Sequence, residues 1–159
     1  MKIDFLLVQT RSPIVSRDID LLQRLTNHVR VSMTIETDLE TIRKQFTPQA
    51  PPIPSRIQTV EKLVAAGIPT QVAIAPLLPS GEYFPQKLQH IVNRICIDDY
   101  FMGDGSAGKR TEKIGIKEKY SELGLEEWCT PQAYQKVYTR FLKVFPKNQI
   151  YISQSGFER

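Results

Sequence analysis

Cysteine is scarce in this chain, because its 159 residues include only Cys96 and Cys129. The two lie far apart in the sequence, and neither has a second cysteine at metal-ligand spacing, so no disulfide framework, zinc motif or iron–sulfur motif is indicated. Histidine is equally rare: His28 and His90 stand at no ligand spacing, and we interpret both as surface or structurally satisfied residues. No Ser/His/Asp triad and no carboxylate pair is recognisable. We therefore predict no metal site made by this chain.

Long apolar runs are also missing. No stretch approaches the roughly 20 residues that a membrane-spanning helix needs, and residues 1–10 lack the apolar core and cleavage site of a secretory signal. The composition, with 41% hydrophobic and 24% charged residues, is ordinary for a globular protein, and the length suffices for one well-packed core. We expect a single cytoplasmic domain over residues 1–159, without membrane contact.

The charge balance is only mildly basic, with a formal net charge of +4 and a pI of about 9.1. Such an excess allows contact with phosphate groups without requiring it. Charge alone therefore leaves nucleic-acid binding and an ordinary solvated surface both open.

Residues 56–79 carry the pattern around which the rest of the chain is organised. Apolar residues recur there at helical spacing, namely Ile57, Val60, Leu63 and Val64. Ser55 with Gln58 forms a capping box in front of this helix, and Gly67 is placed to end it in the left-handed conformation. Residues 72–75 then form a short, nearly continuous apolar run. A strand covered on both faces has this composition, which favours parallel pairing.

The same alternation of strand and helix runs along most of the chain. Strands are predicted over residues 2–9, 29–35, 94–101 and 149–152, with a proline-rich connector over 48–54. Helices are predicted from Ser16 to about Asn27, from Thr37 to before Pro48, over 83–92 and 116–123, and from Thr130 to Phe145, where we interpret Ser16, Thr37 and Thr130 as caps. This order predicts an α/β fold of right-handed βαβ units with one parallel sheet.

Candidate functional residues follow the predicted strands, because ligands of parallel α/β folds bind beyond the carboxyl ends of the strands. These ends are residues 10–12, 34–36, 76–79 and 98–100. Asp98 and Asp99 are adjacent in a predicted strand and would point to opposite faces, so we do not expect them to share a site. One of them is expected to cap the next loop.

The glycine-rich stretch over residues 103–111 resembles a phosphate-binding loop in spacing. Arg110 stands where such a loop has serine or threonine, and no clean apolar helix follows. Two interpretations stay open: Gly103, Gly105, Lys109 and Arg110 hold a phosphate or carboxylate group, or the stretch is a basic surface loop.

Several ordered motifs carry a family resemblance. The run TRSPIVSRDIDLL, then VRVSMTIETD, then SRIQTVEKLVAAGIPTQVAIAPLLP, resembles the middle of radical S-adenosylmethionine (SAM) proteins of the spore photoproduct lyase-like branch. The stretch IDDYFMGDGSAGKRT resembles the continuation in some members. The resemblance extends from about residue 3 to about residue 129 and is most specific over residues 10–79.

This resemblance implies a partial (β/α) barrel with parallel strands, with βα units over about residues 1–101 and the basic loop and C-terminal helices over 102–159. It also implies SAM bound at the strand ends and cleaved reductively at a [4Fe–4S] cluster, and a substrate that is DNA in the lesion-repair members. By motif, Arg11 would pair with the methionine carboxylate and Ser32 would contact the sugar or amino-acid part. Ala75 and Pro76 would form the wall beside the adenine. Thr34 is counted with this site, and Arg56 is given no more than a positioning role.

One departure from the family limits the expected activity. The CxxxCxxC motif that supplies three thiolates to the cluster is absent, and Cys96 and Cys129 cannot replace it. We expect the cluster-less, carboxy-terminal portion of a radical SAM protein, inactive alone, and needing a cluster-bearing partner chain or part; an exposed strand edge would also allow a homo-oligomer. The alternative is a non-catalytic anion- or nucleic-acid-binding module that uses the loop over 103–111.

Overall fold

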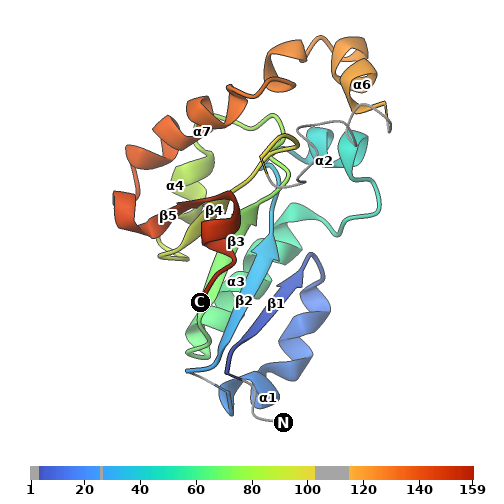
Figure 1. Cartoon of the computed structure of the whole chain (residues 1–159). Helices are drawn as coiled ribbons and strands as arrows, with labels where there is room; N and C mark the ends of the chain where they lie inside the picture. Colours follow the sequence, from blue (N-terminus) through green and yellow to red (C-terminus); the bar gives the residue numbers. More distant parts are fainter. Residues whose placement is uncertain (1–3, 26, 103–114) are drawn as a thin grey trace.

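The structure is a computed structural model that describes residues 4–25, 27–102 and 115–159 (Figure 1). Its strands are β1 (Leu6–Thr10), β2 (Val29–Thr34), β3 (Thr70–Ile74), β4 (Ile95–Ile97) and β5 (Ile150–Ile152). Its α-helices are α1 (Ile19–Gln23), α2 (Glu40–Phe46), α3 (Ile53–Ala65), α4 (Phe84–Leu88), α6 (Ile116–Glu122) and α7 (Ala133–Leu142), and its 3₁₀ helices are η1 (Pro13–Asp18), η2 (Glu126–Trp128), η3 (Lys147–Gln149) and η4 (Ser153–Gly156).

The strands form one five-stranded sheet in the order β1-β2-β3-β4-β5, and every neighbouring pair is parallel. Each strand therefore lies beside the next strand in sequence, which is the arrangement of a (β/α) barrel wall. The predicted α/β class with a parallel sheet is confirmed. Helices lie in the crossovers between these parallel strands: η1 and α1 connect β1 to β2, and α2 and α3 connect β2 to β3.

The two faces of the sheet differ in chemistry. One face is largely apolar, because register pairs such as Met33 with Val72 and Val72 with Ile95 place apolar side chains side by side. Leu63 of α3 packs on this face with Val29 and Val31. The other face is polar, since the register aligns Gln9 with Ser32, Ser32 with Gln71 and Ala73 with Cys96. In a closed barrel this second face would line the interior.

The α3 unit shows how tertiary contacts modify local signals. Gly67 ends the helix with φ +74°, and the Ile68 amide donates to the Leu63 carbonyl at 3.0 Å, so the predicted left-handed stop is confirmed. The buried face differs from the predicted stripe, because Arg56 is fully buried whereas Val64 is 41% exposed.

The predicted N-terminal caps at Ser16, Ser55 and Thr130 are wrong, whereas Thr37 acts in part as predicted, because its hydroxyl accepts a hydrogen bond from the Leu39 amide at 3.1 Å just before α2. The Ser12 hydroxyl, rather than that of Ser16, accepts a hydrogen bond from the Ile14 amide at the start of the helical segment 13–23. At α2, α3 and α7, the residue at the N-cap position makes no side-chain capping hydrogen bond. Competing hydrogen-bond partners, some local and some distant in sequence, explain the difference. The Thr37 hydroxyl donates to the Pro79 carbonyl, Ser55 and Thr130 donate to preceding carbonyls, and the Glu40 carboxylate takes over the cap of α3 by accepting from the Ile53 amide.

Several predicted elements are shorter in the structure. The strand predicted over 94–101 is reduced to β4 because Asp99 accepts hydrogen bonds from the amides of Phe101 and Met102, both at 2.7 Å, and so turns the chain. The expectation that one aspartate caps the next loop is confirmed. The helix predicted over 83–92 covers only α4, but Phe84, Leu88 and Val92 are buried as its pattern predicted. Among the described residues, no helix is both long and apolar enough to cross a bilayer.

Candidate functional site

A buried carboxylate joins two arginines beyond the carboxyl ends of β1 and β2. Glu36 follows β2 and is fully buried. Its Oε1 accepts a hydrogen bond from Nε of Arg11, which follows β1, and its Oε2 accepts from Nη1 of Arg56 at 2.7 Å. Arg56 comes from the first turns of α3 and also donates to the Thr34 carbonyl at 2.8 Å. The cluster carries one net positive charge, anchored to the ends of two strands and one helix.

The free part of this cluster belongs to Arg11. Its side chain is 45% exposed, whereas those of Glu36 and Arg56 are fully buried. In the described part of the chain, Nε of Arg11 bonds to Glu36 and its two terminal nitrogens make no hydrogen bond. Two parallel N–H groups in this state are suited to a bidentate contact with a carboxylate or phosphate group.

Arg11 borders a cavity of about 410 Å³ at the carboxyl ends of β1, β2 and β3. The cavity is lined by Gln9, Thr10, Arg11, Thr34, Ala75 and Phe157. Its volume lies in the range of small-molecule sites, and its place at the strand ends is where parallel α/β folds bind ligands. Arg11 also borders a second hollow, of about 660 Å³, formed with Ser12 and residues 46–51.

The structure brings three of the five residues predicted for the cofactor site together at this cavity, namely Arg11, Thr34 and Ala75. Ser32 lies deeper on the same face of β2, fully buried, and its hydroxyl accepts a hydrogen bond from Gln71 Nε2 at 2.9 Å. Pro76 follows Ala75 through a cis peptide bond and does not line the cavity. Whether these residues bind a cofactor stays a prediction.

Two residues of the site were missed or undervalued in the sequence. Phe157 lines the cavity although it lies about 80 residues beyond Ala75 in the sequence. No local sequence pattern predicts this position. Glu36 was noted only as a residue at a strand end. Its usable signal is a carboxylate directly after the strand predicted over residues 29–35, where an ionised group that becomes buried needs a partner.

Tyr100 adds a neutral phenol near the cluster. Burial, followed by Cys129 and by the negative charge of Glu36, raises the pKa of Tyr100 to about 12, although Arg11 opposes the shift. Tyr100 therefore remains protonated at neutral pH. It lies within electrostatic reach of both Glu36 and Arg11.

The two cysteines are not prepared to bind metal. Burial raises the pKa of Cys96 to about 12 and also raises that of Cys129, so both remain thiols at neutral pH, whereas a metal ligand is a thiolate. Within residues 4–25, 27–102 and 115–159, no group of three His, Cys, Asp or Glu side chains is placed to hold an ion. The predicted anion-binding residues Gly103, Gly105, Lys109 and Arg110 lie outside the described residues.

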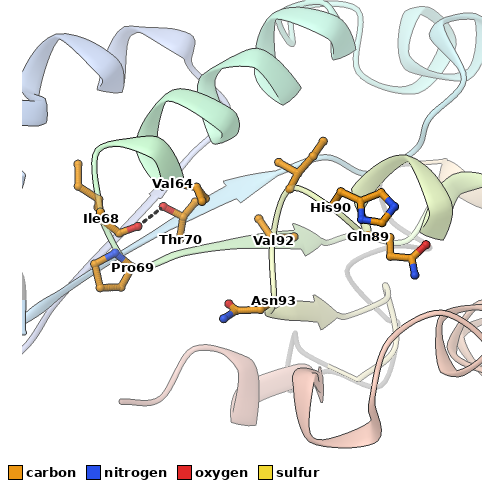
Figure 2. A pocket seen from close by; sticks show the side chains of 10 residues that line it. Val64, Ile68, Pro69, Thr70, Gln89, His90, Val92 and Asn93 are labelled. Carbon is orange, nitrogen blue, oxygen red and sulfur yellow. Dashed lines mark hydrogen bonds between the residues drawn. The ribbon is translucent and has the colours of Figure 1, made fainter.

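A third cavity, of about 430 Å³, lies at the opposite, amino-terminal end of β3 (Figure 2). Its lining consists of Val64 and residues 67–70 from the end of α3 and residues 89–93 from the turn after α4. Figure 2 shows that the Thr70 hydroxyl is occupied by a hydrogen bond to the Ile68 carbonyl. Because the residues around this cavity include no Lys, Arg, Asp or Glu, we favour the cavity beside Arg11 as the functional site.

Comparison with known proteins finds one sequence relative and a set of solved structures with a similar fold. No family model matches the chain. An uncharacterized protein of Acidianus two-tailed virus, ORF301, is 34% identical over 127 residues, which cover 76% of this chain and 40% of the viral protein. Spore photoproduct lyase with one cysteine changed to serine has a TM-score of 0.61 and 15% identity, covering 93% of this chain and 50% of the lyase. The same lyase with alanine at a cysteine position, bound to dinucleoside spore photoproduct, has a TM-score of 0.59 and 15% identity, with the same coverage.

The chain thus spans 40% of the viral protein and half of the lyase. The sheet order and the structural similarity confirm the predicted partial barrel.

Proposed function

We propose that this chain forms part of the SAM site and of the substrate site of a radical enzyme similar to spore photoproduct lyase. The observation that carries the proposal is Arg11, which the buried Glu36 holds through Nε beside a cavity at the strand ends, while its terminal nitrogens make no hydrogen bond to any described residue. A guanidinium in this state fits the carboxylate of an amino acid. The shared fold of spore photoproduct lyase supports the same assignment.

The residues around the cavity fit SAM. Arg11 would pair with the carboxylate, the Thr34 hydroxyl would donate to or accept from a polar atom of the ligand, and Ala75 would offer a small apolar contact. Bound next to a reduced iron–sulfur cluster, SAM supplies a radical that removes a hydrogen atom from the substrate. The chain's own part in this chemistry is to bind and orient the ligand.

The residues do not fit the cluster itself. A site-differentiated [4Fe–4S] cluster needs three thiolates, and the sequence has two cysteines, of which Cys96 is fully buried in the polar face of the sheet. We therefore propose that the cluster is held by other βα units, on a partner chain or on another part of the same protein. In the described structure, β1 pairs with β2 on one side alone. Its other edge is the place where a preceding parallel strand would add.

The first test is titration calorimetry of the chain with SAM. Arg11→Ala should weaken binding about 10- to 100-fold, which is the loss expected for hydrogen bonds to a charged group. Thr34→Val, which keeps the shape and removes the hydroxyl, should weaken it less. Arg24→Ala is the matched control, because Arg24 is an exposed arginine at the end of α1, and this variant should bind as the wild type does. Equal binding by Arg11→Ala and wild type would contradict the proposal.

The second candidate is a non-catalytic anion- or nucleic-acid-binding module. The net charge of +4 supports it, and its loop over residues 103–111 lies outside the described residues. Absence of SAM binding together with a DNA affinity that falls steeply with salt would favour this candidate, because phosphate contacts release counterions.

A further inference from the structure

The C-terminal segment, residues 153–159, crosses the polar face of the sheet. It leaves β5 through Ser153, whose φ is +51°, and forms η4. Three strands in succession then bond to its backbone: Cys96 of β4 donates to the Ser153 carbonyl at 3.6 Å, Gln71 of β3 to that of Gly156 at 2.9 Å, and Arg30 of β2 to that of Glu158 at 2.7 Å. Figure 1 shows this segment (red) in front of the sheet.

The contact at Gly156 leaves no space for any other residue. A Cβ atom on Gly156 would lie 2.1 Å from Sγ and 2.6 Å from Cβ of Cys96. Non-bonded atoms do not approach this closely. The obstacle is the Cβ and Sγ of Cys96, whose side chain is buried in β4 and cannot move aside. The glycine therefore lets the segment backbone lie directly on the sheet.

The side chain of Gln71 links this contact to the rest of the face. Its Nε2 donates both to Gly156 and to the Ser32 hydroxyl, and its Oε1 accepts from Arg94 Nε at 2.8 Å. The guanidinium of Arg94 in turn lies 3.5 Å from the centroid of the Tyr151 ring. A buried amide with its donors and acceptor occupied is a rigid support, so the segment is held by a satisfied polar layer.

Phe157 lies between the two anchored residues Gly156 and Glu158, and it lines the cavity beside Arg11. The cavity thus has among its walls a phenylalanine and a cation whose terminal N–H groups bond to no described residue. A ligand that fits both carries an anionic group and a flat ring. Aromatic rings and nucleobases pack well on phenyl side chains.

From this geometry we infer that the C-terminal segment is a fixed wall of the strand-end cavity, and that Phe157 selects ligands by packing against the ring of a nucleoside. The inference rests on the proposed function and deepens it. The nucleoside ring belongs either to the cofactor or to a nucleic-acid substrate. Binding of 5′-methylthioadenosine reports the cofactor, and binding of thymidine reports the substrate base.

The test compares four probes by calorimetry: SAM, methionine, 5′-methylthioadenosine and thymidine. Phe157→Leu keeps an apolar side chain and removes the ring. It should weaken SAM and methylthioadenosine about two- to tenfold and leave methionine unchanged. Arg11→Ala should show the reverse selectivity, weakening SAM and methionine but not methylthioadenosine. A loss for thymidine but not for methylthioadenosine in Phe157→Leu would support the inference with the substrate base as the source.

The outcomes separate the two claims. If Phe157→Leu binds all four probes as the wild type does while Arg11→Ala loses SAM, the proposed function stands and this inference is wrong. If Phe157→Leu loses the nucleosides and Arg11→Ala loses nothing, Phe157 keeps its role and the carboxylate site at Arg11 is wrong. If the wild type binds none of the probes, both are wrong.

A readout without ligand tests the wall itself. In a Cys129→Ser background, Cys96 should react with a thiol reagent at least tenfold more slowly in the native chain than in urea, because the segment covers it and burial raises its pKa to about 12. Gly156→Ala, which forces the segment off the sheet, should accelerate labelling in the native state. Labelling of the native chain at the urea rate would show that the segment is not a fixed wall and would overturn the inference.

Discussion

Arg56 is the residue whose environment is hardest to satisfy. Its side chain is fully buried, yet both of its described hydrogen bonds use Nη1, and Nε and Nη2 have no hydrogen-bond partner among the described residues. A buried guanidinium is tolerated because the Glu36 carboxylate neutralises it. The pair therefore fixes the geometry of the strand ends more than it adds net stability. Its contribution to the site is to hold Glu36 where that carboxylate positions Arg11.

Removing one partner of this buried pair should be costly. We expect Arg56→Met to lower the free energy of unfolding by about 3 kcal/mol, because Glu36 loses its buried partner. Arg11→Ala should cost at most about 1 kcal/mol, since Arg11 is half exposed. Urea unfolding at constant m measures both. The double variant Glu36→Met with Arg56→Met should recover most of the loss, and equal losses for Arg11→Ala and Arg56→Met would contradict this account.

At the scale of elements, α3 depends on a partner from another helix. The Glu40 carboxylate of α2 accepts from the Ile53 amide at the start of α3 and from Nε of Arg43 at 2.7 Å. Burial disfavours its ionisation, but the hydrogen bonds from Arg43 and Ile53 and the charges of Arg43 and Arg56 outweigh this, so the pKa of Glu40 lies below its usual value. One side chain thus joins α2, the proline-rich connector and α3.

This cap predicts a pH dependence. Because its pKa is lower in the folded state, Glu40 stabilises the fold above its unfolded pKa of about 4.3, and this stability is lost as the pH falls through the folded value. Glu40→Ala should cost about 1 kcal/mol at neutral pH, and the difference from wild type should shrink as the pH falls below the unfolded pKa of Glu40. Glu61→Ala, at an exposed position of α3, is the control. A difference that stays constant with pH would show that Glu40 does not act through its charge.

At the scale of the whole molecule, the five strands form one wall of a barrel with its polar face covered by the C-terminal segment and its β1 edge paired on one side in the described structure. Four of the five residues of β1 are partly buried, and the fifth, Gln9, is exposed. A strand with one free row of backbone groups accepts another strand, which is why we place the cluster-bearing units at this edge.

The proposal predicts the outcome of cluster reconstitution. Incubated anaerobically with iron and sulfide, the chain alone should develop no [4Fe–4S] absorption, because its two thiols are too few. Cys96→Ser and Cys129→Ser variants should behave like the wild type. A stable cluster that either substitution abolishes would contradict the proposal and would require ligands from a second copy of the chain.

The sequence by itself determined the class of fold and several local features. The alternation of apolar runs with helical periodicity was enough for a parallel α/β sheet, and Gly67 had to end α3 because only a residue without a side chain adopts its φ of +74° readily. The motifs around Arg11, Thr34 and Ala75 indicated residues that the fold does bring together. These are properties of neighbouring residues or of whole segments, so they can be predicted without knowing which distant residues they contact.

Tertiary structure alone decided which polar groups meet. The Thr37 hydroxyl donates to the distant Pro79 carbonyl, and the Glu40 carboxylate accepts from the Ile53 amide at the start of α3. The hydroxyls of Ser16, Ser55 and Thr130 instead donate to carbonyls three residues earlier, a local alternative that the capping pattern does not exclude. Likewise, a helical wheel places Arg56 beside apolar residues. It does not show that Glu36, 20 positions earlier, forms the buried ion pair that neutralises Arg56. The place of Phe157 depends on the path of the segment over β4, β3 and β2. The contact of Arg56 with Glu36 and the place of Phe157 join residues that are far apart in the chain, and no local pattern predicts them because the fold alone sets their distance.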